Sequence, residues 1–103
     1  VGFDFIRPPK VEFEIKDNVL SIKSFDAESR IKGEYKTHGF DAFSMVLVDN
    51  SYDGKTFNFT NVYFNTDFKK YSVYIPGLIK GKRIMLIFID KFGNEFKTDM
   101  ELK

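Results

Sequence analysis

Hydrophobic residues in this chain recur at every second position, in short runs separated by turn-forming residues about every 8–12 residues. The clearest case is 11–16, where Val11, Phe13 and Ile15 alternate with charged residues. The same pattern predicts strands at 11–16, 19–25, 43–49, 56–60 with 62–64, 71–75, 83–90 and 95–102. About seven short strands predict an all-β fold, an antiparallel β-sandwich of the immunoglobulin or fibronectin type III kind. A five-stranded oligonucleotide-binding barrel is the alternative, but it leaves two strands unexplained.

Length and composition predict one domain. We expect residues 11–103 of the 103-residue chain to form it, and residues 1–10, with Arg7-Pro8-Pro9-Lys10, to be a linker or leading segment of a longer chain. The chain has no Cys, which excludes disulfides and thiolate metal sites. Its longest apolar run, 84–89, is far shorter than the ~20 residues of a membrane helix, and we expect a cytoplasmic location without membrane contact.

The residues predict no catalytic, cofactor-binding or metal site. His38 is the single histidine, and no nucleophile–base pair or phosphate-binding loop accompanies it. Asp49 to Gly54 places oxygen side chains as calcium loops do, but Thr60 stands where a bidentate Glu is needed. We therefore interpret this segment as a turn, in which Asp and Asn side chains bond their own backbone.

Two strands are apolar on both faces, which indicates a covered outer face. If Met45, Leu47, Leu86 and Phe88 fill the core, alternation assigns the opposite side to a second group. That group is the candidate docking face, formed by Val46, Val48, Met85, Ile87 and Ile89. An outer sheet face is normally polar, so we expect this one to be covered either by the 26–42 loop or by another protein surface.

A basic patch is the second candidate site. It consists of Lys69, Lys70, Lys80, Lys82 and Arg83, provided that the two turns carrying them lie at one end of the sandwich. Such a patch would contact the DNA backbone weakly and without sequence preference. Overall the chain has a formal charge of only +1, so any DNA contact must be local.

The second half of the chain resembles the C-terminal region of adenine-specific DNA methyltransferases of the type III restriction-modification class. The matching stretches are 46–49 (Val-Leu-Val-Asp), 52–57 (Tyr-Asp-Gly-Lys-Thr-Phe) and 84–95, which ends in an Asp-x-x-Gly turn. The resemblance covers about residues 43–102, and Arg7-Pro8-Pro9 is a weaker echo.

The resemblance implies a parent enzyme that methylates adenine with S-adenosylmethionine, while this fragment is not itself an enzyme. The chain lacks the Asp-Pro-Pro-Tyr and Phe-x-Gly-x-Gly motifs of that family, so no catalytic or cofactor residue is carried over. What is implied is a noncatalytic accessory domain that packs on the methyltransferase catalytic domain, on a restriction subunit or on DNA. The alternative is an immunoglobulin-like adhesion or carbohydrate-binding module of a bacterial surface protein.

Overall fold

The chain forms two antiparallel sheets in a computed structural model that describes residues 9–29, 35–38 and 40–102. The strands are β1 (Lys10–Lys16), β2 (Val19–Ser29), β3 (Tyr35–His38), β4 (Phe43–Asp49), β5 (Asn61–Phe64), β6 (Ser72–Tyr74), β7 (Arg83–Asp90) and β8 (Glu95–Glu101). Two single 3-10 turns, η1 (Phe40–Ala42) and η2 (Asn65–Asp67), precede β4 and follow β5. The predicted all-β sandwich is confirmed.

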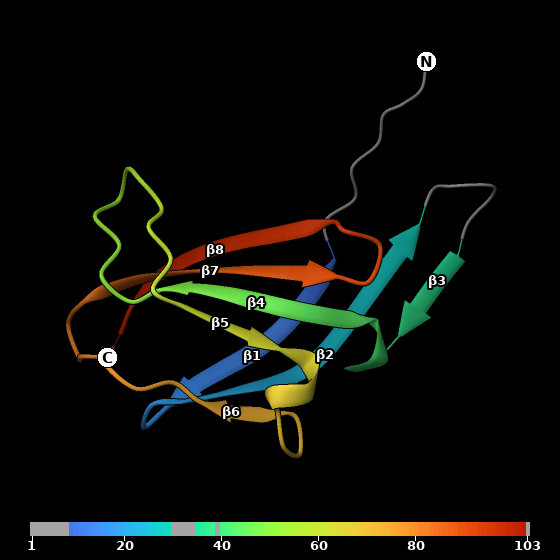
Figure 1. Cartoon of the computed structure of the whole chain (residues 1–103), viewed down its shortest axis with the longest axis horizontal. Helices are drawn as coiled ribbons and strands as arrows, with labels where there is room; N and C mark the ends of the chain where they lie inside the picture. Colours follow the sequence, from blue (N-terminus) through green and yellow to red (C-terminus); the bar gives the residue numbers. More distant parts are fainter. Residues whose placement is uncertain (1–8, 30–34, 39, 103) are drawn as a thin grey trace.

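The strands pair into two layers (Figure 1). In the first sheet β2 pairs with β1 on one side and with β3 and β6 on the other. The second sheet has the order β5-β4-β7-β8, so its two longest apolar strands lie in the middle. Central strands are paired at both edges, so neither β4 nor β7 exposes a row of unpaired backbone groups.

The core lies between the two sheets and is rich in phenylalanine. The Phe43 ring lies 5.1–5.3 Å from the rings of Phe25, Phe40 and Phe68, edge-to-face with Phe25 and Phe68 and tilted by 45° against Phe40. On β7, the inward side chains are those predicted, Ile84, Leu86 and Phe88, each with no exposed surface. These rings and aliphatic groups fill the space between the layers.

The predicted register of β4 is wrong after Phe43. Val46 and Val48 are fully buried members of the core, whereas Met45 and Leu47 are half-buried on the outer side. The cause is a β-bulge, because Phe43 pairs with Asp90 and Met45 with Ile89, which leaves Ser44 as an extra residue. One extra residue turns every later side chain to the opposite face of the sheet.

Strand predictions differ from the structure mainly in two polar segments. Residues 56–60 are not a strand, and the pairing with β4 begins at Asn61. The 26–42 segment continues β2 to Ser29 and then contributes β3, while residues 30–34 and 39 lie outside the described residues. Of the predicted linker 1–10, Lys10 already belongs to β1, and 1–8 lie outside the described residues.

Within the described residues no helix is long and apolar enough to cross a membrane.

Candidate interaction surface

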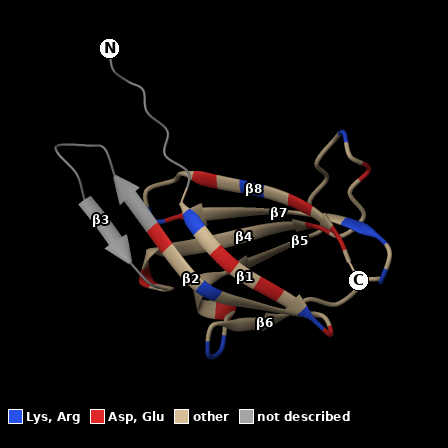
Figure 2. Ribbon diagram, turned by 180° about the vertical axis from the view of Figure 1, so that it is seen from behind, with Lys and Arg blue, Asp and Glu red and all other residues tan. Residues whose placement is uncertain are grey.

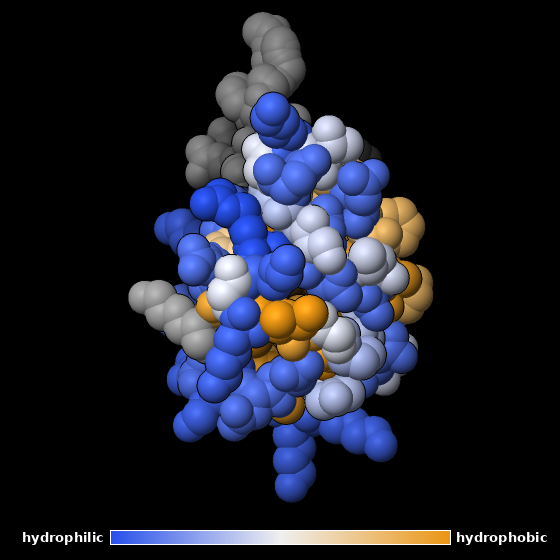
Figure 3. Space-filling model, turned by 90° about the vertical axis from the view of Figure 1, so that its left-hand side faces the viewer, coloured by the Kyte–Doolittle hydropathy of each residue, from blue (hydrophilic) through white to orange (hydrophobic). Residues whose placement is uncertain are grey.

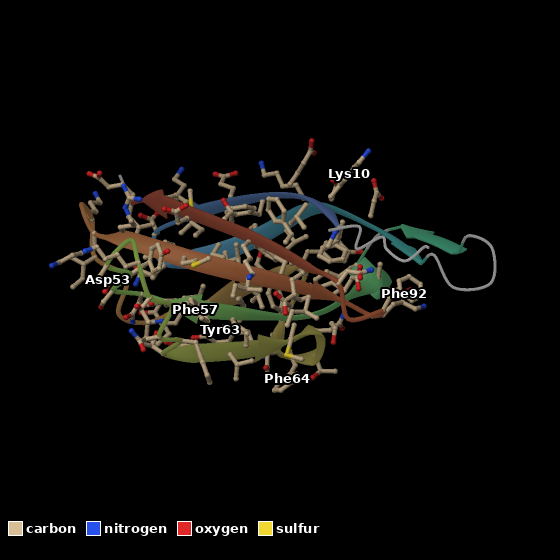
Figure 4. All side chains as sticks on the ribbon, turned by 90° about the horizontal axis from the view of Figure 1, so that it is seen from above. Lys10, Asp53, Phe57, Tyr63, Phe64 and Phe92 are labelled. Atoms are coloured by element: carbon tan, nitrogen blue, oxygen red, sulfur yellow. The ribbon has the colours of Figure 1, made fainter. Side chains whose placement is uncertain are left out.

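The outer side of the second sheet carries six apolar side chains in two rows. Strand pairing aligns Phe64, Met45 and Ile89 in one row and Val62, Leu47 and Ile87 in the next, across β5, β4 and β7. We call these six residues the outer grid. In Figure 4 Phe64 projects from the side of β5, whereas Lys10 projects from the opposite side of the molecule. The outer grid therefore lies on the side of the second sheet that faces away from the core.

Ile87 shows how closely the outer grid is packed. It is only 7% exposed, although it does not belong to the core cluster between the sheets. Its neighbours across the ladder, Leu47 and Lys97, are half-buried and exposed respectively. A buried isoleucine on an outer face is unusual, because that face of an antiparallel sheet is normally solvated.

Charged side chains of β8 border the outer grid. Glu95 lies beside Ile89, Lys97 beside Ile87 and Asp99 beside Met85. The Lys97 ammonium and the Glu95 carboxylate are 3.8 Å apart, at the limit of an ion pair, whereas Arg83 holds Asp99 at 2.7 Å. The border therefore has alternating sign along one edge of the apolar surface.

The 50–60 loop closes the far end of the outer grid, where β4 stops. Asp49 is 2% exposed and accepts hydrogen bonds from the backbone N–H groups of Ser51 (3.0 Å) and Asn58 (2.8 Å). At the tip, the N–H groups of Lys55 and Thr56 donate to Asp53 and hold the pKa of its carboxyl below the ordinary value. The acidic residues of the calcium-like sequence therefore bond the loop's own backbone.

Three phenylalanine rings of the 57–64 segment are at least partly exposed. Phe57 and Phe59 are stacked with ring centroids 6.3 Å apart, and Phe59 is 59% exposed. Phe64, at the edge of the outer grid, is 49% exposed. Figure 3 shows hydrophobic side chains in the middle and at the right-hand margin of a face that is otherwise mostly polar.

The predicted docking face is split by the β4 bulge. Met85, Ile87 and Ile89 lie on the outer side as predicted, but Val46 and Val48 point into the core. Met45 and Leu47 take their places, and Val62 and Phe64 of β5 complete the surface. Apart from Ser44, residues 43–48 are apolar at both odd and even positions, so alternation alone could not choose between the faces. The Val62–Phe64 alternation was the signal that could have located the β5 part.

The described part of 26–42 does not cover the outer grid. β2 continues to Ser29 and β3 pairs with it, so both belong to the first sheet. Figure 1 shows β3 beside β2, in the layer away from β5. The described residues therefore do not support the 26–42 loop as the cover of this face.

The five basic residues do not form one patch. Lys69 and Lys70 precede β6, and Lys80 and Lys82 follow it, so the two groups lie at opposite ends of that strand (Figure 2). Arg83 is engaged with Asp99. The assumption that both turns share one end is wrong, because β6 runs between them. Each half could neutralise only a few phosphates of a DNA backbone.

The described surface has several hollows, and two of them lie at strand edges and turns. One, of about 580 Å³, lies between β5 and β6, where Asn61 donates to the Tyr63 hydroxyl and burial raises the pKa of that phenol. The other, of about 300 Å³, lies at the 17–18 turn, beside Ile15, Leu78 and Leu102. Among the described residues, no three metal-binding side chains gather.

In comparisons with known proteins, no family model, no curated protein and no solved structure matches this chain.

Proposed function

We propose that this chain is a noncatalytic β-sandwich module that associates with a protein surface through the outer grid. The observation that carries the proposal is the apolar character of both faces of β4 and β7, with Met45, Leu47 and Ile89 left only half-buried on the side away from the core. One apolar face suffices to build a sandwich. The second is a feature that folding of the isolated domain does not require.

The energetics of the outer grid favour association. An apolar patch of a few hundred Å² is at the limit of what monomers usually expose. Burying it at about 25 cal/mol per Å² contributes several kcal/mol before the costs of association are subtracted. Half-buried aliphatic side chains with a charged border are also the usual anatomy of a protein interface, which has an apolar centre and a polar rim.

We further propose that the sandwich is of the immunoglobulin type. The order β1-β2-β6 in one sheet and β5-β4-β7-β8 in the other matches the A-B-E and C′-C-F-G strands of that architecture, with β3 as an addition between B and C. The type is compatible with many functions, so it supports a binding module without naming its partner.

Replacing Leu47 with Lys tests whether the outer grid is free surface. Leu47 is half-buried in the middle of the grid. Because the ammonium can reach water while its stem lies on the sheet, we expect the free energy of unfolding to fall by no more than about 1 kcal/mol. Urea unfolding of Leu47→Lys, with Leu47→Ala as the matched control for lost volume, measures this. A loss above about 3 kcal/mol in Leu47→Lys would show that the grid is structural and would contradict the proposal.

On the resemblance to DNA methyltransferases, we further propose that this module belongs to the C-terminal region of an adenine-specific enzyme. The resemblance rests on the 46–57 and 84–95 stretches alone. Because the cofactor and adenine motifs are missing, we expect no S-adenosylmethionine binding by this chain. Calorimetric titration with the cofactor checks this, and saturable heat at micromolar concentrations would contradict the noncatalytic assignment.

A further inference from the structure

We propose that the partner of the outer grid is a second copy of this chain, in a face-to-face dimer whose two-fold axis runs across the strands between the two rows. This inference rests on the proposed function, because it names the occupant of the same surface. A two-fold interface must be self-complementary, since the same patch contributes both halves. The outer grid and its β8 border meet this requirement.

The apolar rows match under such a rotation. A half-turn about an axis between the rows places each row opposite the other row of the second copy. Met45 then faces Leu47 of the second copy, Ile89 faces Ile87, and Phe64 faces Val62. Large side chains therefore meet smaller ones or equals in every column, as interdigitated sheets require.

The charges on β8 match in the same arrangement. Glu95 stands in the first row and Lys97 in the second, so each faces the opposite charge of the second copy. Within one chain these two groups are 3.8 Å apart and largely exposed, which leaves both able to pair across an interface. A two-fold axis along the strands would instead place the β8 charges on Phe64 and Val62 and would desolvate them without partners.

The size and overall charge of the molecule set the expected strength. Each position on a sheet face occupies about 4.8 by 6.8 Å. The six positions of the outer grid, together with those of Glu95 and Lys97, therefore give a footprint of roughly 260 Å². This is well below the roughly 800 Å² per partner of a standard interface, so the proposed dimer is a weak and transient one. We expect a Kd on the order of 100 µM. A formal charge of +1 means that two copies do not repel strongly at long range.

Sedimentation equilibrium with charge reversals tests the dimer. We expect the wild-type chain to shift from monomer to dimer between about 20 µM and about 1 mM. Lys97→Glu should raise Kd about tenfold, because carboxylates then face carboxylates. The double variant Glu95→Lys, Lys97→Glu should restore Kd to within about twofold, since it exchanges the two charges. Thermal unfolding of each variant at low concentration controls for effects on the monomer.

Restoration by the double variant supports the dimer and its axis. A wild-type chain that stays monomeric at about 1 mM, a double variant without restoration, or undiminished dimerisation by Leu47→Lys would each overturn the inference. The proposed function fails by a different result, the loss of stability in Leu47→Lys. A monomeric wild type with a stable Leu47→Lys variant therefore rejects the second copy and leaves the outer grid as a surface for another protein.

Discussion

Replacing Val46 with Asp should abolish cooperative folding. Val46 has no exposed surface and pairs with Phe88 on the core side of the second sheet. An aspartate there must bury a carboxyl group without a partner, which costs several kcal/mol, and it also removes the packing of the valine. Since domains of this size are stable by about 5–15 kcal/mol, a loss above about 4 kcal/mol leaves little or no native population.

Met45→Asp is the matched control, because it makes the adjacent position acidic on the opposite face. We expect it to retain a cooperative urea transition, with a loss of about 1 kcal/mol, since Met45 is half-buried at the surface. Circular dichroism during urea titration measures both variants. A folded Val46→Asp beside an unfolded Met45→Asp would show that β4 has the register that simple alternation predicts.

Asp90→Ala should lower the free energy of unfolding by about 3 kcal/mol. Asp90 is 1% exposed at the end of β7, and its Oδ1 accepts the backbone N–H groups of Phe92 (2.9 Å) and Asn94 (2.8 Å). Alanine leaves both donors of the β7–β8 turn without this acceptor, in a partly buried site. Charged acceptors contribute more than neutral ones, so the effect should exceed that of an ordinary turn hydrogen bond.

Asp90→Asn separates charge from geometry. Its amide oxygen can still accept from the two N–H groups, so we expect a loss of about 1 kcal/mol. Chemical denaturation measures all three proteins. If alanine and asparagine cost the same, or if alanine costs less than about 1 kcal/mol, the carboxylate does not hold this turn as the geometry indicates.

The sequence predicts the central strands well and the faces of β4 poorly, for a physical reason. β4 and β7 have the predicted bounds, 43–49 and 83–90, because each is an apolar run that ends in Asp before a turn. The choice of face depends on one unpaired residue, Ser44, and a bulge is determined by pairing with β7 rather than by composition. Whether the polar 26–42 segment forms a strand was equally ambiguous from the sequence, because β3 is defined by its pairing with β2.

The candidate sites show the same division. β7 has no irregularity in its ladder with β8, so Met85, Ile87 and Ile89 take the predicted outer side. The basic residues are near one another in sequence, but the short strand β6 places their turns at opposite ends. Local pattern therefore predicts which residues are apolar or charged, and long-range pairing decides which of them meet.

Methyl NMR with a soluble paramagnetic agent tests the central claim, that the second sheet keeps one apolar face for the core and the other for association. In a dilute sample we expect the agent to attenuate the methyl signals of Met45, Leu47 and Ile89 and to spare those of Val46 and Val48. In a concentrated sample, Met45, Leu47 and Ile89 should become protected as copies associate. Attenuation of Val46 and Val48, or Met45 and Leu47 signals that are protected even at high dilution, would contradict this assignment of the two faces.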